Sequence, residues 1–272
     1  MNPPHPACRS THRPRERADF RQYLWPGLRR GLALALVAVL GIAPQFAQAA
    51  DTVIGSGKVH TESRDVSGFQ AVTLRGPMNL VLRQGPRERV EVRADHNLLP
   101  LIETRVVERV GLPTLEIGSQ SGASYSTLNQ MTVTVDLVDL QALTLSGSGD
   151  TQCDRLKTGT LRLTLSGSGN LKLGQVGADV LDIRLSGSGD VEAAGRAARV
   201  TLLVSGSGTA QLRGLQADEV GVRLAGSGDA SVNARRSLTA ALAGSGDLSY
   251  VGEPSVQSTV SGSGSLKKLR TP

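Results

Sequence analysis

The residues of this chain that could do chemistry are serines and aspartates in a short glycine-rich motif that recurs along its second half. The stretch LTLSGSGD at 143–150 returns as LTLSGSGN, IRLSGSGD, LLVSGSGT, VRLAGSGD, AALAGSGD and STVSGSGS. These hydroxyls, carboxylates and backbone amides could form a repeated ligand site, or they could form the corner of a repeated structure. The first glycines of successive motifs are 18–20 residues apart, so a repeat architecture is considered first.

The sequence around the motifs indicates strands. Apolar residues alternate with polar ones on both sides, as at Leu161, Leu163 and Leu165 before one motif and Leu171 and Leu173 after it. A period of two indicates strands with one buried face. No helical stretch separates the units, the leucine-rich-repeat framework is absent, and propeller blades need about 40 residues per unit. The pattern predicts an all-β fold, a parallel β-helix (β-solenoid) with coils of 18–20 residues.

In such a stack each SGSG motif is expected at a corner, where one strand face bends into the next. Glycine permits the bend and a close approach of the backbone, and larger side chains would collide with their equivalents in neighbouring coils. We therefore interpret the motif as a packing corner and not as a binding loop. The predicted corner glycines are Gly147, Gly149, Gly167, Gly169, Gly187, Gly189, Gly206, Gly208, Gly226, Gly228, Gly244, Gly246, Gly262 and Gly264.

The residue after each motif is acidic or polar. These residues are Asp150, Asn170, Asp190, Thr209, Asp229, Asp247 and Ser265. A continuous row of carboxylates at this spacing would repel itself, and the neutral members interrupt it. Calcium binding by this row stays open as an alternative, although the glycine-aspartate nonapeptide of calcium-binding solenoids is absent. A carboxylate pair for sugar hydrolysis, such as Asp229 with Asp247, is a second chemical alternative.

Few other residue types suggest chemistry. Only two histidines, His60 and His96, lie outside the first 49 residues, which argues against a histidine metal cluster. His96 is expected to have a capping or surface role. Cys153 stands on the apolar register of the repeat and is predicted to be a small buried hydrophobe. The charged residues expected to face outward in salt-bridged ladders are Arg162, Asp182, Arg184 and Arg223. No cofactor or metal site is predicted.

The first 49 residues are predicted to be a secretory signal peptide. A basic segment precedes an apolar stretch at 32–43, and the small residues AQA predict cleavage after Ala49. The apolar stretch is too short to cross a membrane, which needs about 20 residues, so no transmembrane span is expected in the mature chain. The remaining residues carry 23 Lys and Arg against 22 Asp and Glu, and this near neutrality argues against nucleic-acid binding.

The rest of the chain, 50–272, is predicted to form one domain. Its second part, 141–272, holds the regular repeats, and the terminal units of a repeat protein are expected to be atypical. Residues 50–140 are therefore interpreted as irregular coils and a cap. Within them, 95–104 is expected to be a short helix or loop over the end of the stack, and 118–130 is expected to be a polar loop.

One stretch of this first part has the layout of a coil. The sequence FQAVTLRGPMNLVLRQG at 69–85 contains two alternating runs joined by a glycine-containing bend. Arg75, Gly76, Pro77 and Asn79, together with the row of Asp and Asn residues after the glycine-rich motifs, are candidate binding residues, because they are polar or lie at bends.

Three stretches carry a resemblance to a known family. They are GFQAVTLRGPMNLVLRQG at 68–85, VEVRADHNLLPLIET at 90–104, and the serial SGSGD or AGSGD coils up to Gly264. In their order and spacing they are similar to the putative auto-transporter adhesin, head GIN domain family. The resemblance implies a right-handed parallel β-helix, export from the cytoplasm and an adhesive or surface role, and it implies no particular biochemical mechanism.

These observations favour an exported, adhesin-like, non-enzymatic binding or scaffold protein of the bacterial cell envelope or surface, in the periplasm or outside the cell. It would touch a surface polysaccharide or an envelope protein through many weak contacts along one face. Two alternatives stay open: a carbohydrate-active enzyme, either lyase or hydrolase, and a structural protein that self-associates through an open coil end. The low apolar content of the last coil, with Ser258 and Lys268, argues for a blunted end.

Overall fold

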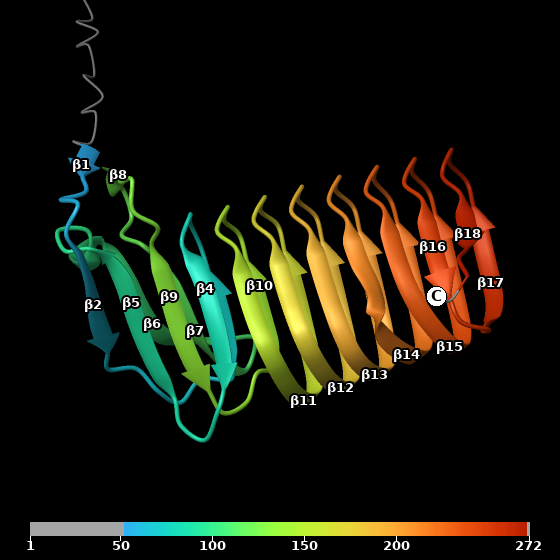
Figure 1. Ribbon diagram of the computed structural model, residues 1–272, viewed down its shortest axis with the longest axis horizontal. Helices are drawn as coiled ribbons and strands as arrows, with labels where there is room; N and C mark the ends of the chain where they lie inside the picture. The colour runs from blue at the N-terminus through green and yellow to red at the C-terminus, as the bar shows by residue number, and fades with distance from the viewer. Residues whose placement is uncertain (1–51, 271–272) are drawn as a thin grey trace, which may run out of the picture. The chain divides into compact units, whose positions relative to one another are not determined.

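The computed structural model describes residues 52–270, which belong to one compact unit. The predicted signal peptide and its cleavage after Ala49 lie outside the described residues. The described residues form strands joined by turns, with a single 3-10 turn η1 at Leu99–Leu101 (Figure 1). In this part of the chain no helix has the length and apolar character needed to cross a membrane.

The strands fall into an irregular N-terminal set and a regular set. The N-terminal strands are β1 (Thr52–Ile54), β2 (Val59–Arg64), β3 (Ala71–Leu74), β4 (Asn79–Gln84), β5 (Arg89–Asp95), β6 (Ile102–Arg109), β7 (Leu112–Ser119), β8 (Ser124–Ser126) and β9 (Thr132–Leu137). The regular strands are β10 (Ala142–Leu145), β11 (Thr151–Leu165), β12 (Leu171–Leu185), β13 (Val191–Val204), β14 (Ala210–Leu224), β15 (Ala230–Leu242), β16 (Leu248–Val251), β17 (Ser255–Val260) and β18 (Leu266–Lys268).

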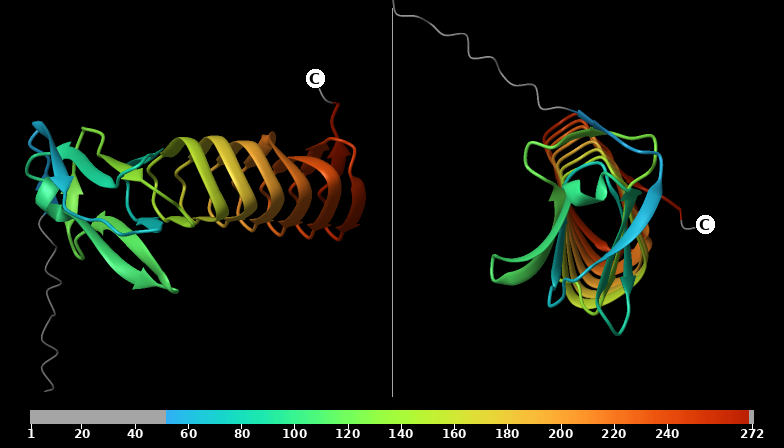
Figure 2. Two further views of the ribbon diagram at one scale, coloured as in Figure 1. Left: turned by 90° about the horizontal axis from the view of Figure 1, so that it is seen from below. Right: turned by 90° about the vertical axis from the view of Figure 1, so that its left-hand side faces the viewer.

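The regular strands stack in parallel as coils of a solenoid. Each of β11 to β15 begins directly after one glycine-rich corner, bends round the far side of the coil, and ends directly before the next corner (Figures 1 and 2). Equivalent residues pair from coil to coil, as Leu163 does with Ile183 and Ile183 with Leu202. The predicted parallel β-helix with coils of 18–20 residues is therefore confirmed.

Each repeat has a short polar stretch between its two apolar runs, and in the structure this stretch is part of the strand. In β12 the stretch GQVGAD continues the extended backbone, so that one strand of 15 residues runs from corner to corner. Val176 in this stretch is 3% exposed, and its equivalent Leu156 in β11 is 1% exposed. In these two coils an inward apolar side chain packs the bend against the core, as it would not in a surface loop.

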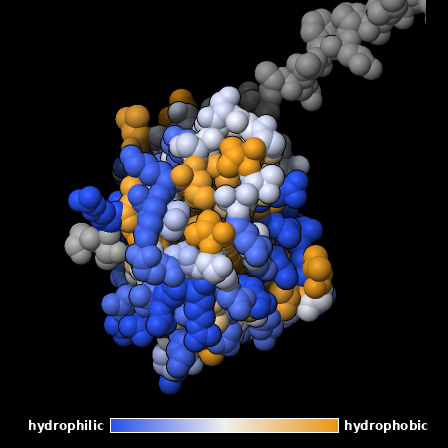
Figure 3. Space-filling model, turned by 90° about the vertical axis from the view of Figure 1, so that its right-hand side faces the viewer, coloured by the Kyte–Doolittle hydropathy of each residue, from blue (hydrophilic) through white to orange (hydrophobic). Residues whose placement is uncertain are grey.

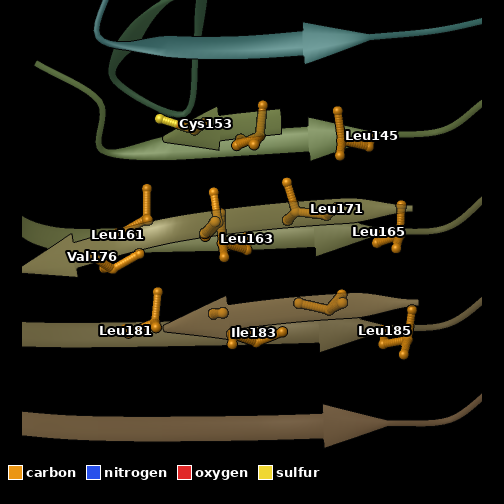
Figure 4. Close-up of a cluster of buried hydrophobic side chains, with 14 of the residues drawn as sticks. Leu145, Cys153, Leu161, Leu163, Leu165, Leu171, Val176, Leu181, Ile183 and Leu185 are labelled. Carbon is orange, nitrogen blue, oxygen red and sulfur yellow. The ribbon is translucent and has the colours of Figure 1, made fainter. Parts of the chain in front are cut away.

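The core is a set of apolar ladders inside the stack. Leu161, Leu163 and Leu165 of β11 point inward above the equivalent residues of β12 (Figure 4). Burial of each such side chain contributes about 2 kcal/mol. Cys153 belongs to the same interior, with 2% of its surface exposed, between Leu82 of β4 and Leu173 of β12. The prediction of a small buried hydrophobe at this position is confirmed.

The N-terminal part contains coils, as predicted, but their order in the stack differs from their order in the sequence. The strands β3 and β4 form one coil with a corner at Gly76, and they pair with β10 and β11 on one side. On the other side they pair in parallel with β7 and β9. The first coil of the sequence therefore lies second in the stack, and the later pair β7 and β9 lies outside it.

The cap is built from antiparallel strands, which the repeat pattern does not predict. Strand β5 pairs antiparallel with β9 and β2, while β6 pairs antiparallel with β7 in a hairpin. Residues 95–104 comprise the end of β5, the turn η1 and the start of β6, so the expected short helix or loop is a single 3-10 turn. The expected polar loop 118–130 is interrupted by β8, which pairs with β1.

Candidate functional site

The repeated motif lies at the corners of the stack, and its glycines are fixed by packing. A Cβ on Gly167 would lie 1.7 Å from the carbonyl oxygen of Gly147 in the previous coil, and one on Gly169 would lie 2.0 Å from that of Gly149. All fourteen predicted corner glycines have a backbone oxygen of the preceding coil at 1.7–2.1 Å from such a Cβ. No side chain fits there, because neighbouring backbones touch at each corner.

The residue after each motif is tied to the coil beside it. Asn170 donates its backbone N–H to Oδ1 of Asp150 at 3.1 Å, and Asp190 donates its own to Oδ1 of Asn170 at 3.1 Å. The same bond joins Thr209 to Asp190 at 2.8 Å. Asn79, a predicted binding candidate, begins the row by accepting from the N–H of Asp150 at 2.9 Å. These side chains therefore satisfy backbone donors that would otherwise lack a protein partner.

We call the residues after the motifs, together with Asn79, the Asp/Asn row. The sequence suggests that its neutral members relieve charge repulsion, whereas the structure shows side-chain oxygens bound to backbone N–H groups. Each of the bonds along the row is accepted by an Asp or Asn side-chain oxygen, which both residue types supply. Asp229 and Asp247, the carboxylate pair considered for sugar hydrolysis, are joined in the same way at 2.8 Å. Within residues 52–270 no group of three or more His, Cys, Asp or Glu side chains is placed to hold a metal ion. The two histidines, His60 and His96, lie against each other in the cap with ring centroids 4.9 Å apart.

One outward surface of the solenoid gathers arginines, and we call it the arginine face. It consists of the outward side chains of β6, β7, β3, β10 and the C-terminal halves of β11 to β15, which pair in that order. Its first row is Arg105, Glu116, Thr73, Thr144, Thr164, Arg184, Leu203, Arg223 and Ala241. Its second row is Val107, Thr114, Ala71, Ala142, Arg162, Asp182, Thr201, Gly221 and Thr239.

At the N-terminal end of this face three arginines surround one buried carboxylate. Glu116 is 5% exposed, and Arg105 donates to its Oε2 from Nη2 at 3.0 Å. Arg109 donates to Oε1, and Arg75 places Nη2 3.6 Å from the same oxygen. Burial acts to raise the pKa of Glu116, but the hydrogen bonds and charges of these arginines outweigh it, and the pKa lies below its ordinary value. The carboxylate stays ionised and positions the guanidinium groups.

Arg75 is the one candidate of the RGP bend that takes part in this cluster. Gly76 and Pro77 belong to the corner, since the Cβ of an Ala at Gly147 would meet the carbonyl of Gly76. A hollow of about 430 Å³ beside the cluster is lined by Thr73, Arg75, Glu103, Arg105, Ser119 and Ser121, among others. Sequence reasoning missed Glu116, Arg105 and Arg109, because the antiparallel hairpin that brings them to Arg75 leaves no repeat signal.

The middle of the arginine face carries exposed arginines without ion pairs. Arg162, Arg184 and Arg223 face outward as predicted, but none of them forms an ion pair with any described residue. The predicted salt-bridged ladder is therefore wrong at these positions. Arg162 lies directly across from Asp182, yet the long side chains extend into solvent, where a surface pair contributes little. The cations remain available to a ligand.

Comparisons with known proteins agree with this architecture. Residues 68–254 match the family described as putative auto-transporter adhesin, head GIN domain. A crystal structure of a putative adhesin from Bacteroides fragilis aligns with a TM-score of 0.76 and 24% identity, over 80% of this chain and 100% of that one. No curated protein sequence matches the chain.

Two further solved structures come from Parabacteroides. One, a putative adhesin from Parabacteroides merdae, aligns with a TM-score of 0.65 and 23% identity, over 81% of this chain and 100% of that one. The other, described as a putative lipid binding protein from Parabacteroides distasonis, has a TM-score of 0.66 and 25% identity over 80% of this chain and 100% of that one. At these identities the likeness concerns the fold.

Proposed function

The chain belongs to the putative auto-transporter adhesin, head GIN domain family, and we propose that it acts as an exported, adhesin-like, non-enzymatic binding or scaffold protein of the bacterial cell envelope or surface. The observation that carries the proposal is the arginine face, on which Arg162, Arg184 and Arg223 form no ion pair with any of residues 52–270. Equivalent strands repeat along this face at about 4.8 Å. A long partner can therefore contact several coils at once, and many weak contacts add to a useful affinity.

The partner is expected to be a surface polysaccharide or an envelope protein with negative charge. Residues 50–272 have nearly balanced charge, with 23 basic and 22 acidic residues. In the middle of the arginine face, Arg162, Arg184 and Arg223 stand beside a single carboxylate, that of Asp182, so this part of the face carries net positive charge. Arginine forks bind carboxylate and phosphate groups through two parallel hydrogen bonds.

The state of two buried titratable groups supports a non-enzymatic role. Ion pairing holds the pKa of Glu116 below its ordinary value, while burial raises the pKa of the Cys153 thiol to about 11. A general acid or base works best with a pKa near the operating pH, and a nucleophilic cysteine must form its thiolate. Neither group meets its requirement at neutral pH.

A glycan-array screen of the purified protein tests the proposal, with a calcium-free arm and product analysis of every bound glycan. Binding without turnover supports the binding function. Loss of binding in the calcium-free arm would assign the ligand contact to an ion held by the Asp/Asn row. Cleavage of any glycan would contradict the non-enzymatic proposal and favour a carbohydrate-active enzyme.

A second candidate function is self-association through the last coil. All six residues of β17 are exposed, and Val256 and Val260, which stand in register with the core residues Leu238 and Leu242, are 37% and 46% exposed. Figure 3 shows apolar side chains near the centre of this end and hydrophilic ones around them. Sedimentation velocity of the wild type and of Val260→Glu tests it, because the added charge would dissociate an end-to-end dimer.

A further inference from the structure

The arginine face has a second hollow toward its C-terminal end, between Arg184 and Arg223. A depression of about 390 Å³ lies over β12 to β15, and its rim includes Arg184 and Arg223. Leu203 lies between these arginines in the first row, and Gly221 in the second row is in register with Thr201, diagonally across from Leu203. Gly221 lacks a side chain and has no neighbouring atom within 4 Å of an added Cβ, so it opens the room that a side chain would fill.

The charges around the hollow are spaced by the solenoid itself. Arg184 and Arg223 stand in the same row two coils apart, with Leu203 between them, which places their backbones about 9.6 Å apart, twice the strand spacing. Neither forms an ion pair among the described residues, whereas Arg199, two residues before Thr201 on β13, is paired with Glu219 at 2.8 Å. The hollow thus presents two free cations at a fixed separation on either side of an apolar floor.

The floor and the remaining rim favour a sugar between the two anions. Leu203 and Ala241 offer apolar surface against which the C–H faces of a sugar ring can pack. Asp182 and Thr201 at the rim supply a carboxylate and a hydroxyl that can accept or share hydrogen bonds with sugar hydroxyls. A small inorganic anion would use one arginine and leave this floor uncovered.

We propose that this hollow binds an acidic polysaccharide that carries one carboxylate on every second sugar, with its chain along the solenoid axis. Successive carboxylates would meet Arg184 and Arg223, and the uncharged sugar between them would lie over Leu203 and Gly221. The inference rests on the proposed binding function and adds to it the ligand class, the site and the direction of the chain.

The experiment is isothermal titration calorimetry of the purified protein with three oligosaccharides of equal length. Hyaluronan has a carboxylate on alternate sugars, polygalacturonate has one on every sugar, and chitin oligosaccharide has none. We expect hyaluronan to bind at least about tenfold more tightly than either of the others, which is the ratio that about 1.4 kcal/mol of extra contact supplies. Equal or tighter binding of polygalacturonate would overturn the proposal, because affinity would then follow charge density alone.

Variants separate this site from general electrostatics. Arg184→Gln and Arg223→Gln are each expected to weaken hyaluronan binding about tenfold or more, since each removes one charge-assisted contact. Arg196→Gln is the matched control: this arginine is exposed in β13, has no ion pair among the described residues, and lies outside the hollow. An equal loss in the control would overturn the proposal.

Gly221→Leu tests the hollow without a change of charge. The open space at Gly221 predicts an undiminished unfolding temperature, while the new side chain fills the room above the floor and is expected to abolish most hyaluronan binding. Retention of full affinity would contradict the site. If none of the three oligosaccharides binds but the glycan array yields other ligands without turnover, this inference fails while the proposed function stands.

Discussion

In the regular stack, residues 141–270, polar side chains at the corners are bound to the backbone of the neighbouring coil, whereas in the N-terminal part charged side chains are bound to one another. Asn170 and Asp190 each accept the N–H of the next equivalent residue. Glu116 of β7, by contrast, gathers Arg105 and Arg109 of β6 and Arg75 of the bend after β3. The repeated polar residues therefore stabilise the stack, whereas the charged cluster around Glu116 is formed by residues that do not repeat.

The difference follows from what a parallel stack permits. Each coil lies about 4.8 Å from the next, so any residue in a repeated position faces its own copy. Glycine leaves room for the neighbouring backbone, and Asp or Asn accepts a hydrogen bond from its N–H, so these residues suit that contact in every coil. The cluster around Glu116 joins residues that the repeat does not bring together, and the antiparallel hairpin of β6 and β7 supplies that contact.

The largest expected effect comes from a corner. Gly187→Ala should destabilise the protein by about 3 kcal/mol or more, because its Cβ would lie 1.9 Å from the carbonyl oxygen of Gly167 and backbone would have to move. Gly177→Ala is the control, since its nearest contact is the flexible Lys157 side chain at 3.8 Å. Urea unfolding followed by circular dichroism measures both. Equal stabilities would remove the packing explanation of the motif.

The Asp/Asn row gives a smaller effect that separates acceptor from charge. Asp190→Ala should cost about 1–2 kcal/mol, because the N–H of Thr209 loses its 2.8 Å partner. Asp190→Asn should restore most of this stability, since the amide oxygen accepts the same bond. The same urea experiment decides. If Asn behaves like Ala, the negative charge and not the acceptor is what the row requires.

Glu116 predicts a pH dependence in the cap. Its pKa is lowered in the folded protein, so its contribution to stability is fully present above the unfolded value of about 4.3 and is lost as the pH falls through the folded value. Glu116→Gln should therefore be less stable than the wild type at pH 7, and the gap should narrow below about pH 4. Glu103→Gln, at an exposed position of β6 that forms no ion pair with the described residues, is the control and should change the stability at pH 7 far less than Glu116→Gln. A constant gap would contradict the ion-pair account.

The smallest effect concerns Cys153. Burial raises the pKa of this thiol to about 11, so iodoacetamide should leave it unmodified in the folded protein near neutral pH and alkylate it readily in urea. Mass spectrometry after timed quenching gives both rates. Rapid alkylation of the folded protein would show that the coil at β11 opens locally.

The regular stack could be predicted from the sequence, and the cap could not. The 18–20-residue spacing and the alternation at Leu161, Leu163 and Leu165 are enough to predict coils, because every coil repeats the same contact. Gly76 was recognisable as a corner for the same reason. The reversed order of the β3–β4 and β7–β9 coils depends on non-local pairing, which leaves no local pattern.

The candidate site shows the same division. Outward alternation predicts that Arg162, Arg184 and Arg223 face solvent, and they do. Their lack of ion pairs depends on side-chain conformations that the pattern does not fix. The acceptor role of Asp150 and Asn170 is likewise not predicted from the sequence. Acidic and neutral residues in one row suggest charge relief, whereas each of these side chains accepts a hydrogen bond from a backbone N–H of the next coil.

The most direct test of the central claim compares two variants on one glycan array. One variant carries Arg162→Gln, Arg184→Gln and Arg223→Gln on the arginine face, and the other carries Ser148→Ala, Ser168→Ala and Ser188→Ala at the exposed corners. The account predicts that the arginine variant loses the bound signals of the wild type and that the serine variant keeps them. Loss in the serine variant with retention in the arginine variant would contradict it and return the binding role to the repeated motif.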